Sequence, residues 1–336
     1  MNKSVKIIGS VLITASVIAG AVAGTYIVKP NLDYKKLKGS VEVKPASNAE
    51  GSKDRIHFLS TGSSDAILIE SDGKFALVDC AEDNDNPRGF EELEAEGYEE
   101  RVLEYLKANA MGDDGKVTLD FVLGTHSHSD HIGGFDTIIN DDDIVVKRAY
   151  LKVYKAEEIN DYEVERWDNQ EVYDQMMDAL NSKNVPVISE MDGTPFALGN
   201  FTITLFNTYD DNSAGKVGEN DNSLGVLIEK NGTKIFLSGD INNVSGDEER
   251  MAPQIGKINL LKVGHHSYSG STSKPWLRTL APDICIVTNN YESIDFRTVR
   301  RITRVAEAPT FITGEENGII AVIGDSGQID LYNDIH

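Results

Sequence analysis

Residues 125–131, with the sequence THSHSDH, constrain the fold of this chain more than any other segment. They place three histidines and an aspartate within six residues, directly after the apolar, β-prone stretch TLDFVLGT. Imidazole and carboxylate groups are the ligands that zinc and similar divalent ions prefer in proteins. The alternative is a histidine-rich surface loop without a function. Matching ligand-type residues downstream favour a metal site at the end of a strand.

The spacing within this loop divides its ligands into two sets. His126 and His128 alternate, so in an extended loop they point toward one metal ion. Asp130 and His131 follow at the expected turn into a helix, where they reach a neighbouring ion. The glycines at 133–134 are expected to let the backbone turn tightly after these ligands.

Two further strands of the sequence end in ligand-type residues. Asp240 closes FLSGD and is well suited to bridge two metal ions, whereas His265 in LLKVGHH is expected to complete the second site with Asp130 and His131. His266 is expected to face the substrate, where it can protonate a leaving alcohol, rather than to bind a metal.

Asp79 also ends an apolar strand, KFALVDC, and its expected role is to orient a ligand histidine. Metal-bound imidazoles usually donate their second N–H to such an acceptor. His57 lies inside an expected strand, so we assign it to packing. The predicted catalytic residues are Asp130, Asp240 and His266. The predicted metal ligands are His126, His128, Asp130, His131, Asp240 and His265.

Apolar, β-prone stretches come in two batches along the chain, with helical spacing in residues 90–109 and 168–184 between or beside them. The expected strands include IHFLS, AILIES, KFALVDC and TLDFVLGT in the first batch, and FTITLFN, LGVLIEKNGTKIFLSGD and INLLKVGHH in the second. This order predicts an α/β sandwich, in which two sheets pack face to face and helices cover the outside.

The amino terminus carries a targeting signal. Lys3 and Lys6 precede the apolar stretch 7–28, which is about long enough to span a bilayer. Residues 21–23 fit a cleavage site, but the apolar run continues beyond them, which favours an uncleaved anchor. The predicted organisation is a signal peptide or membrane anchor at 1–29, a flexible tether at 30–53 and a globular domain with the metal site at 54–336. The domain is therefore expected to be exported, either anchored at the outer face of the cytoplasmic membrane or secreted.

The composition is strongly acidic, with 55 Asp and Glu against 32 Lys and Arg and a formal net charge of −23. Such a surface repels phosphate backbones, which disfavours nonspecific binding of nucleic acid. The two cysteines, Cys80 and Cys285, lie in apolar stretches and are expected to be buried free thiols, with a disulfide left open as the alternative.

The motif His126-x-His128-x-Asp130-His131 resembles the HxHxDH motif of the metallo-β-lactamase superfamily. The stretches GSSDAILIE and FALVDC, SLGVLIE and IFLSGD, and LLKVGHH follow in the order of that family, so the resemblance covers about residues 55 to 325. It implies the αββα fold and two divalent metal ions, with zinc favoured over manganese. It also implies a hydrolase that uses a metal-bound hydroxide and needs no serine or cysteine nucleophile.

Two groups within the superfamily are similar beyond the metal motif. The stretches RAYLKVY, RWDN and GDINNVSGDEERMAPQIGKINLLKVGHH resemble phosphorylcholine esterase catalytic domains, and NDNSLGVLIE and LKVGHHS resemble the hydrolase-like domain of competence DNA-uptake channels. The implied function is a phosphodiesterase on phosphorylcholine-like or other cell-surface phosphodiesters. The alternatives are an extracellular DNA nuclease and a non-catalytic metal-binding surface protein. Trp167, Tyr154 and Tyr268 are candidates to contact a quaternary ammonium group.

One segment departs from the family pattern. Many members place a histidine before the strand that reads SLGVLIE here, whereas this chain has Glu219-Asn220-Asp221-Asn222-Ser223. The first metal site is therefore expected to use an oxygen ligand, or a water molecule held by Asn220.

Overall fold

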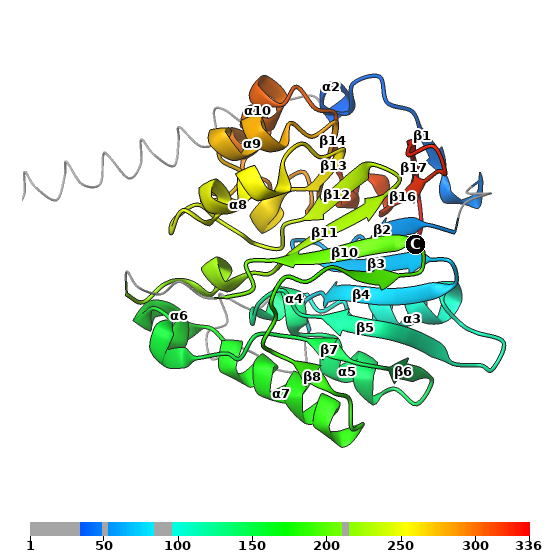
Figure 1. Cartoon of the computed structure of the whole chain (residues 1–336), viewed down its shortest axis with the longest axis vertical. Coiled ribbons are helices and arrows are strands. Elements are labelled where there is room, and N and C mark those ends of the chain that lie inside the picture. The colour runs from blue at the N-terminus through cyan, green and yellow to red at the C-terminus, as the bar shows by residue number, and fades with distance from the viewer. Residues whose placement is uncertain (1–33, 49–52, 84–95, 210–214) are drawn as a thin grey trace, which may run out of the picture. The chain divides into compact units, whose positions relative to one another are not determined.

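The computed structural model describes residues 34–48, 53–83, 96–209 and 215–336 (Figure 1). The chain divides into two compact units, Met1–Gly39 and Ser40–His336. In the first unit the described element is helix α2 (Tyr34–Lys38). The apolar stretch 7–28 lies outside the described residues. No helix in the described ranges has the length and apolar character needed to cross a membrane.

The second unit contains two sheets that pack face to face (Figure 1). The first sheet contains, in spatial order, β1 (Val43–Pro45), β17 (Ile329–Asn333), β16 (Ile319–Ile323), β2 (Arg55–Phe58), β3 (Ala66–Ser71), β4 (Lys74–Cys80), β5 (Val117–Leu123), β7 (Ala149–Tyr150) and β8 (Val187–Ile188), while β6 (Ile144–Val146) pairs with β5. The second sheet contains β15 (Thr310–Ile312), β14 (Ile284–Val287), β13 (Leu260–Lys262), β12 (Thr233–Leu237), β11 (Gly225–Lys230), β10 (Phe201–Phe206) and β9 (Phe196–Leu198).

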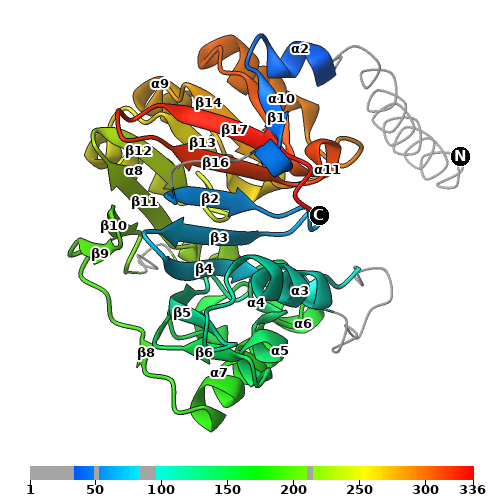
Figure 2. The same cartoon turned by 90° about the vertical axis from the view of Figure 1, so that its right-hand side faces the viewer.

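Helices cover the outer face of each sheet (Figure 2). The first sheet is covered by α3 (Glu99–Asn109), α4 (Ser129–Ile132), α5 (Phe135–Asn140) and α7 (Asn169–Ser182), with α6 (Asp161–Arg166) before α7. Beside the second sheet lie α8 (Asp247–Ile255), α9 (Lys274–Leu280), α10 (Phe296–Val305) and the single turn α11 (Thr313–Glu316). The predicted αββα sandwich is confirmed.

Strand β3 shows why the apolar runs are continuous rather than alternating. All of its residues are buried, because Ile67 and Ile69 face the core between the two sheets, whereas Leu68 faces the core beneath the helices. Successive side chains of a strand point to opposite faces, so a strand covered on both sides needs apolar residues at nearly every position.

The helix predicted at 168–184 corresponds to α7, and it buries Val172, Met176 and Leu180 as its spacing predicts. The helix predicted at 90–109 is described from Glu99 onward as α3, since residues 84–95 lie outside the described ranges. Both helices pack on the first sheet with one apolar stripe, as amphipathic surface helices do.

The sheet begins earlier than the expected domain start at residue 54. Residues Val43–Pro45, within the segment expected to be a flexible tether, form β1 and pair in parallel with Leu331–Asn333 of β17. Val41 and Val43 pack against the central core. A strand of three residues is too short to give a periodic signal, and it gains its order from the unpaired backbone groups of the sheet edge.

Both cysteines are buried and free, as expected for thiols in apolar strands. Cys80 ends β4 of the first sheet and Cys285 lies in β14 of the second sheet. Burial raises the pKa of each thiol above its ordinary value, so neither is a reactive thiolate.

A buried ion pair joins the two sheets at a distance from the histidine loop, the name used here for residues 125–131. The Lys230 ammonium at the end of β11 lies 2.6 Å from Oδ2 of Asp54, which precedes β2, and each side chain is 5% exposed. The Ser71 hydroxyl donates to Oδ1 of Asp54 at 2.6 Å. Removing one partner of such a pair leaves a buried unpaired charge and typically costs about 3–5 kcal/mol.

The acid stability of the fold should depend on His57, which is buried in β2 with Nδ1 at 2.7 Å from the Tyr105 hydroxyl. Burial lowers the pKa of His57 below its ordinary 6.5. The unfolded chain therefore binds a proton that the folded chain resists, and the free energy of unfolding falls as pH drops below 6.5. This loss is at most about 1.4 kcal/mol per pH unit.

We expect His57→Gln to flatten the pH dependence of urea unfolding between about pH 7 and about pH 5 relative to the unsubstituted chain. Parallel curves for the two proteins would show that His57 takes no part in the acid sensitivity.

Candidate metal centre

The histidine loop follows β5 and runs directly into α4. His128 is the residue before the helix, and its carbonyl accepts the backbone N–H groups of His131 and Ile132. Gly133 and Gly134 have helical φ values, so they are not needed for a left-handed turn. A Cβ on either glycine would lie 2.5 Å from a backbone oxygen, so they are required for close packing of α4 instead.

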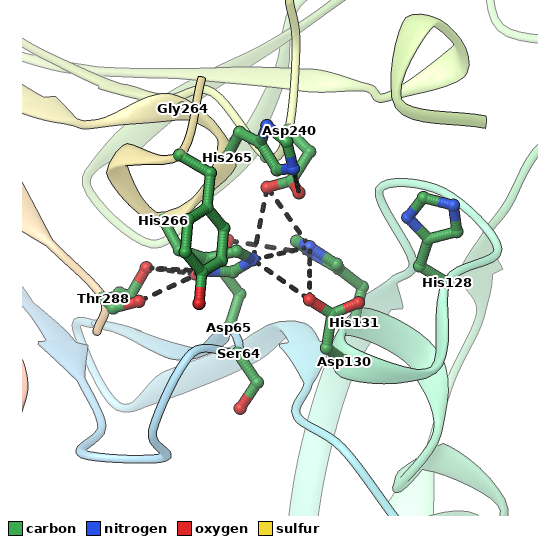
Figure 3. Close-up of polar contacts among 12 residues, drawn as sticks. Ser64, Asp65, His128, Asp130, His131, Asp240, Gly264, His265, His266 and Thr288 are labelled. Atoms are coloured by element: carbon green, nitrogen blue, oxygen red, sulfur yellow. Dashed lines mark hydrogen bonds and ion pairs between the residues drawn. The ribbon is translucent and has the colours of Figure 1, made fainter. Parts of the chain in front are cut away.

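Four side chains converge at the end of this loop (Figure 3). The Nε2 atoms of His131 and His266 lie 3.1 Å apart. Oδ1 of Asp240 lies 3.2 Å from Nε2 of His131 and 3.4 Å from Nε2 of His266. Oδ2 of Asp130 lies 3.3 Å from Nε2 of His266 and 4.0 Å from Nε2 of His131. These four residues are called the inner cluster below.

The inner cluster fits a divalent ion. Zinc bonds of about 2.0 Å in tetrahedral geometry place neighbouring ligand atoms about 3.3 Å apart, close to the separations observed here. Oδ1 of Asp240 is buried without a hydrogen-bond partner. Two imidazole nitrogens that face each other, with this oxygen beside them, need a shared cation or proton between them. The donor set of imidazole and carboxylate is the one that zinc and similar ions bind.

Asp79 holds His131 in the orientation that the cluster needs. Nδ1 of His131 lies 2.8 Å from Oδ2 of Asp79, and the Thr125 backbone N–H and hydroxyl donate to the same carboxylate at 2.7 and 2.9 Å. This contact directs Nε2 of His131 inward. Burial opposes protonation of His131, but the carboxylates of Asp240, Asp79 and Asp130 outweigh it and raise the pKa of the imidazole well above 6.5. The centre therefore favours a cation strongly.

The turn Gly264–Ser267 sends two neighbouring histidines in different directions. His265, His266 and Ser267 have φ values of 52°, 45° and 71°, a run of left-handed residues that typically costs about 1–3 kcal/mol each. The side chain of His266 is fully buried in the inner cluster, and its Nδ1 lies 3.1 Å from the Thr288 carbonyl.

His266 thus takes the place that the sequence analysis gave to His265, beside Asp130 and His131, and does not face the substrate as expected. The His265 side chain is 25% exposed, and its Nε2 lies 3.3 Å from Nδ2 of Asn220 and 3.9 Å from Oδ2 of Asp240. Both residues lie in a left-handed turn, with φ values of 52° and 45°, so the alternation of an extended strand does not decide which of the two rings points inward.

His126 and His128 lie beside the inner cluster rather than in it. Nε2 of His126 lies 2.9 Å from Nδ1 of His128, and Nδ1 of His126 lies 3.1 Å from the Ser223 hydroxyl. Nε2 of His128 lies 3.3 Å from Oε2 of Glu163 in α6. Within the described ranges, the one group of three or more His, Cys, Asp or Glu ligand atoms that gathers within 4.8 Å is Asp65, His131, Asp240 and His266.

The segment in place of the family histidine packs against the histidine loop. Glu219 is buried, and its Oε1 accepts the Ser127 backbone N–H at 3.0 Å. Its other oxygen, Oε2, accepts from Nδ2 of Asn222 at 2.8 Å. Asn220 faces His265, and its Oδ1 is buried without a hydrogen-bond partner. Asn220 therefore contacts His265 through its amide nitrogen, and its oxygen is the buried atom that is open to a further ligand.

Two acidic residues at the site were missed by the sequence analysis. Asp65 lies 3.5 Å from Nδ1 of His266 and 3.8 Å from Nδ1 of His131. It lies just before a buried strand, as Asp79 ends one, and that position is the signal that could have found it. Glu163 lies in a helix whose sequence, DYEVER, resembles any exposed charged helix, so no local signal distinguishes it.

Aromatic rings stand on two sides of the histidines. The Trp167 ring lies 4.5 Å from the His128 ring, centroid to centroid, and the Tyr268 ring lies 5.5 Å from the His265 ring. The Tyr268 hydroxyl donates to the Ser63 hydroxyl at 3.0 Å. Tyr154 is buried near Tyr173, so it serves packing.

Comparison with known proteins gives a consistent match. Residues 100–267 match the Beta-lactamase superfamily domain. The chain is 25% identical to ComE operon protein 3 of Bacillus subtilis over 175 residues, which are 51% of this chain and 20% of that protein. It is 28% identical to a UPF0173 metal-dependent hydrolase of Pyrococcus furiosus over 165 residues, which are 48% of this chain and 62% of that protein. The chain thus spans less than two thirds of either relative.

A solved structure, the metallo-β-lactamase fold protein YhfI from Bacillus subtilis, aligns with 82% of this chain and 98% of its own chain at 12% identity and a TM-score of 0.47.

Replacement of either histidine of the turn should separate their roles. We expect His266→Ala to weaken zinc binding by more than about 100-fold, because substitution of a residue that only supports a metal ligand already costs up to about 100-fold in affinity. His265→Ala should retain the ion of the inner cluster, because its ring lies outside that cluster. The zinc content per chain, measured by mass spectrometry after dialysis, distinguishes the two variants. Equal losses in the two variants would contradict the assignment of His266 to the centre.

Proposed function

Because this chain belongs to the β-lactamase superfamily, we propose that its metal centre hydrolyses phosphodiesters, with phosphorylcholine-like esters or other cell-surface esters as substrates. Metal-dependent hydrolysis is the activity that the family and the centre support together. The observation that carries the proposal is the inner cluster, in which Nε2 of His131 and of His266 face each other beside an unpartnered Asp240 oxygen.

Support for a phosphorylcholine-like substrate comes from the aromatic rings and from charge. The sequence around residues 239–266 resembles phosphorylcholine esterase domains. The rings of Trp167 and Tyr268 flank the histidines, and a quaternary ammonium group binds to such faces. The carboxylate of Glu163 lies beside His128 at the same site and adds attraction for a cationic head group.

Two ions are proposed, with zinc favoured and manganese as the alternative. The inner cluster would hold one ion. His126 and His128 would hold the other, with Asn220 as the expected source of an oxygen ligand or of a bound water molecule. An ion bound here supplies Lewis-acid polarisation of a phosphoryl oxygen and lowers the pKa of a water molecule.

The residues of the chain itself orient the centre and handle a proton. Asp79 and Glu163 direct the rings of His131 and His128, and burial of these groups excludes bulk water. His265 has Nδ1 at 3.0 Å from the Ser269 carbonyl and is partly exposed. The Ser269 carbonyl requires the proton on Nδ1, so Nε2 of His265 is an acceptor. We propose that Nε2 of His265 takes the proton from the attacking water molecule and passes it to the leaving alkoxide, whereas the sequence analysis gave proton donation to His266.

A DNA nuclease is the second candidate, because the matched relatives include ComE operon protein 3 and a protein named Recombination protein 2 of Haemophilus influenzae. The net charge of −23 counts against it, since phosphate backbones are repelled by an acidic surface. Degradation of single-stranded DNA by the zinc-loaded chain, faster than cleavage of a small phosphodiester, would favour this candidate.

The proposed location is the outer face of the membrane. The positively charged start, with Lys3 and Lys6 before the apolar stretch 7–28, supports export with an anchor. A substrate on the cell surface would then lie within reach of the tethered domain.

Hydrolysis of bis(p-nitrophenyl) phosphate by the zinc-loaded chain tests the central proposal. We expect Asp240→Asn to lower the rate by at least about 100-fold and to reduce the zinc content, because it removes a charged ligand from the inner cluster. Asp178→Asn, on the exposed face of α7, is the matched control and should keep full activity. Full metal occupancy without cleavage of any phosphodiester would instead favour the non-catalytic surface protein.

Recognition of the head group is tested with p-nitrophenyl phosphorylcholine. We expect Trp167→Ala to raise KM for this ester by about 2- to 30-fold, the range of a cation–π contact, with little change for the uncharged analogue. Tyr162→Ala removes an aromatic ring that is 58% exposed on α6 and serves as the control. An equal change in KM for both esters would show that Trp167 packs against His128 without contacting the cation.

A further inference from the structure

A buried lysine lies behind the inner cluster. Lys262 ends β13, and its side chain is 0% exposed. Its ammonium contacts the Asp65 carboxylate, donates to the Gly239 carbonyl at 3.0 Å and lies 3.8 Å from Oδ1 of Asp240. A methionine would fill a similar volume without the cost of burying a charge, so the charge itself explains this residue.

Asp65 lies on the outer side of both histidine rings. Its Oδ1 is 3.5 Å from Nδ1 of His266 and its Oδ2 is 3.8 Å from Nδ1 of His131, whereas the Nε2 atoms face each other on the opposite side. The Thr288 hydroxyl donates to Oδ1 at 2.5 Å, and the same hydroxyl lies 3.2 Å from Nδ1 of His266. Both separations between Asp65 and the rings exceed hydrogen-bond distance, so Asp65 acts on His266 through the Thr288 hydroxyl and on His131 through its charge.

Two roles are compatible with the proximity of Asp65 to the other ligand atoms, all within 4.8 Å. Asp65 is either a metal ligand or an acceptor behind the ligands. The contact with the Lys262 ammonium favours the second role. The ammonium touches the Asp65 carboxylate but lies 3.8 Å from Oδ1 of Asp240, so it repels a divalent ion on Asp65 more strongly than one on Asp240. Metal-bound imidazoles in other proteins are oriented by acceptors of this kind.

We propose that Asp65 and Lys262 form a positioning pair for the metal centre. Asp65 holds the Thr288 hydroxyl beside Nδ1 of His266 and places a negative charge behind the His131 ring, which Asp79 orients. Lys262 keeps the Asp65 carboxylate away from the ion. This inference rests on the proposal that the inner cluster binds a divalent ion, and it does not depend on the substrate.

The chain offers a matched control in Lys230 and Asp54. This pair has the same chemistry and similar burial, with 2.6 Å between Nζ and Oδ2 and both side chains 5% exposed. It joins β11 to the residue before β2, and its partners include Ser71 and Asp325 rather than the histidines.

Cobalt(II) titration of the full metal-free chain tests the pair, with the visible absorption of the bound ion as the signal. We expect Asp65→Asn and Lys262→Met to keep the cobalt stoichiometry, to weaken binding by about 10- to 100-fold and to shift the absorption bands. The double variant should lose less than the sum of the two single losses. Lys230→Met and Asp54→Asn should lower the unfolding temperature but leave affinity and spectrum unchanged.

Loss of one cobalt per chain in Asp65→Asn would overturn the proposal, because Asp65 would then be a ligand. Unchanged affinity and spectrum would also overturn it and leave an ordinary structural pair. If either variant fails to fold, Thr288→Val removes only the hydroxyl that donates to Asp65 and should shift the spectrum with a smaller loss of affinity. An unshifted spectrum in that variant would count against the proposal. These readouts are independent of hydrolysis, so a chain that behaves as expected here but cleaves no phosphodiester would refute the proposed function alone.

Discussion

The close approach of two imidazole nitrogens, Nε2 of His131 and Nε2 of His266, is the interaction on which the rest of the site depends. Two lone pairs at this distance repel each other unless a cation or a proton lies between them. The fold maintains the approach through buried acceptors behind the rings, Asp79 for His131 and the Thr288 carbonyl for His266. The αββα sandwich contributes a rigid frame for these contacts, because each ligand follows a strand of one of the two sheets.

Local patterns were sufficient to predict the layers and much of the site. Continuous apolar strands such as β3 indicate a sheet that is covered on both faces, and the ligand-rich loop after β5 predicts the metal centre. Strand ends mark Asp79 and Asp240 as site residues for the same reason. The short edge strand β1 was not predicted, because three residues are too few to show an alternating apolar pattern. Its order comes from pairing with β17, far along the chain.

The remainder of the site depends on backbone conformation and on distant contacts. The positions of His265 and His266 depend on a turn with left-handed φ values that non-glycine residues rarely adopt, so no residue pattern predicts them. Asp65 and Lys262 belong to different sheets, and only the packing of those sheets brings them together. Glu163 contacts His128 from helix α6, whose sequence pattern is that of an exposed helix. These are interactions of tertiary structure, and a single sequence carries little trace of them.

The left-handed turn between β13 and α9 has a further consequence for which changes of sequence this site tolerates. Neighbouring residues of identical chemistry end in different places, His265 partly exposed and His266 buried, so the backbone of the turn and not the side chain decides the role of each. An insertion or deletion of one residue before His266 is therefore expected to displace its ring from the inner cluster. The length of this turn is therefore under a stricter constraint than most of its side chains.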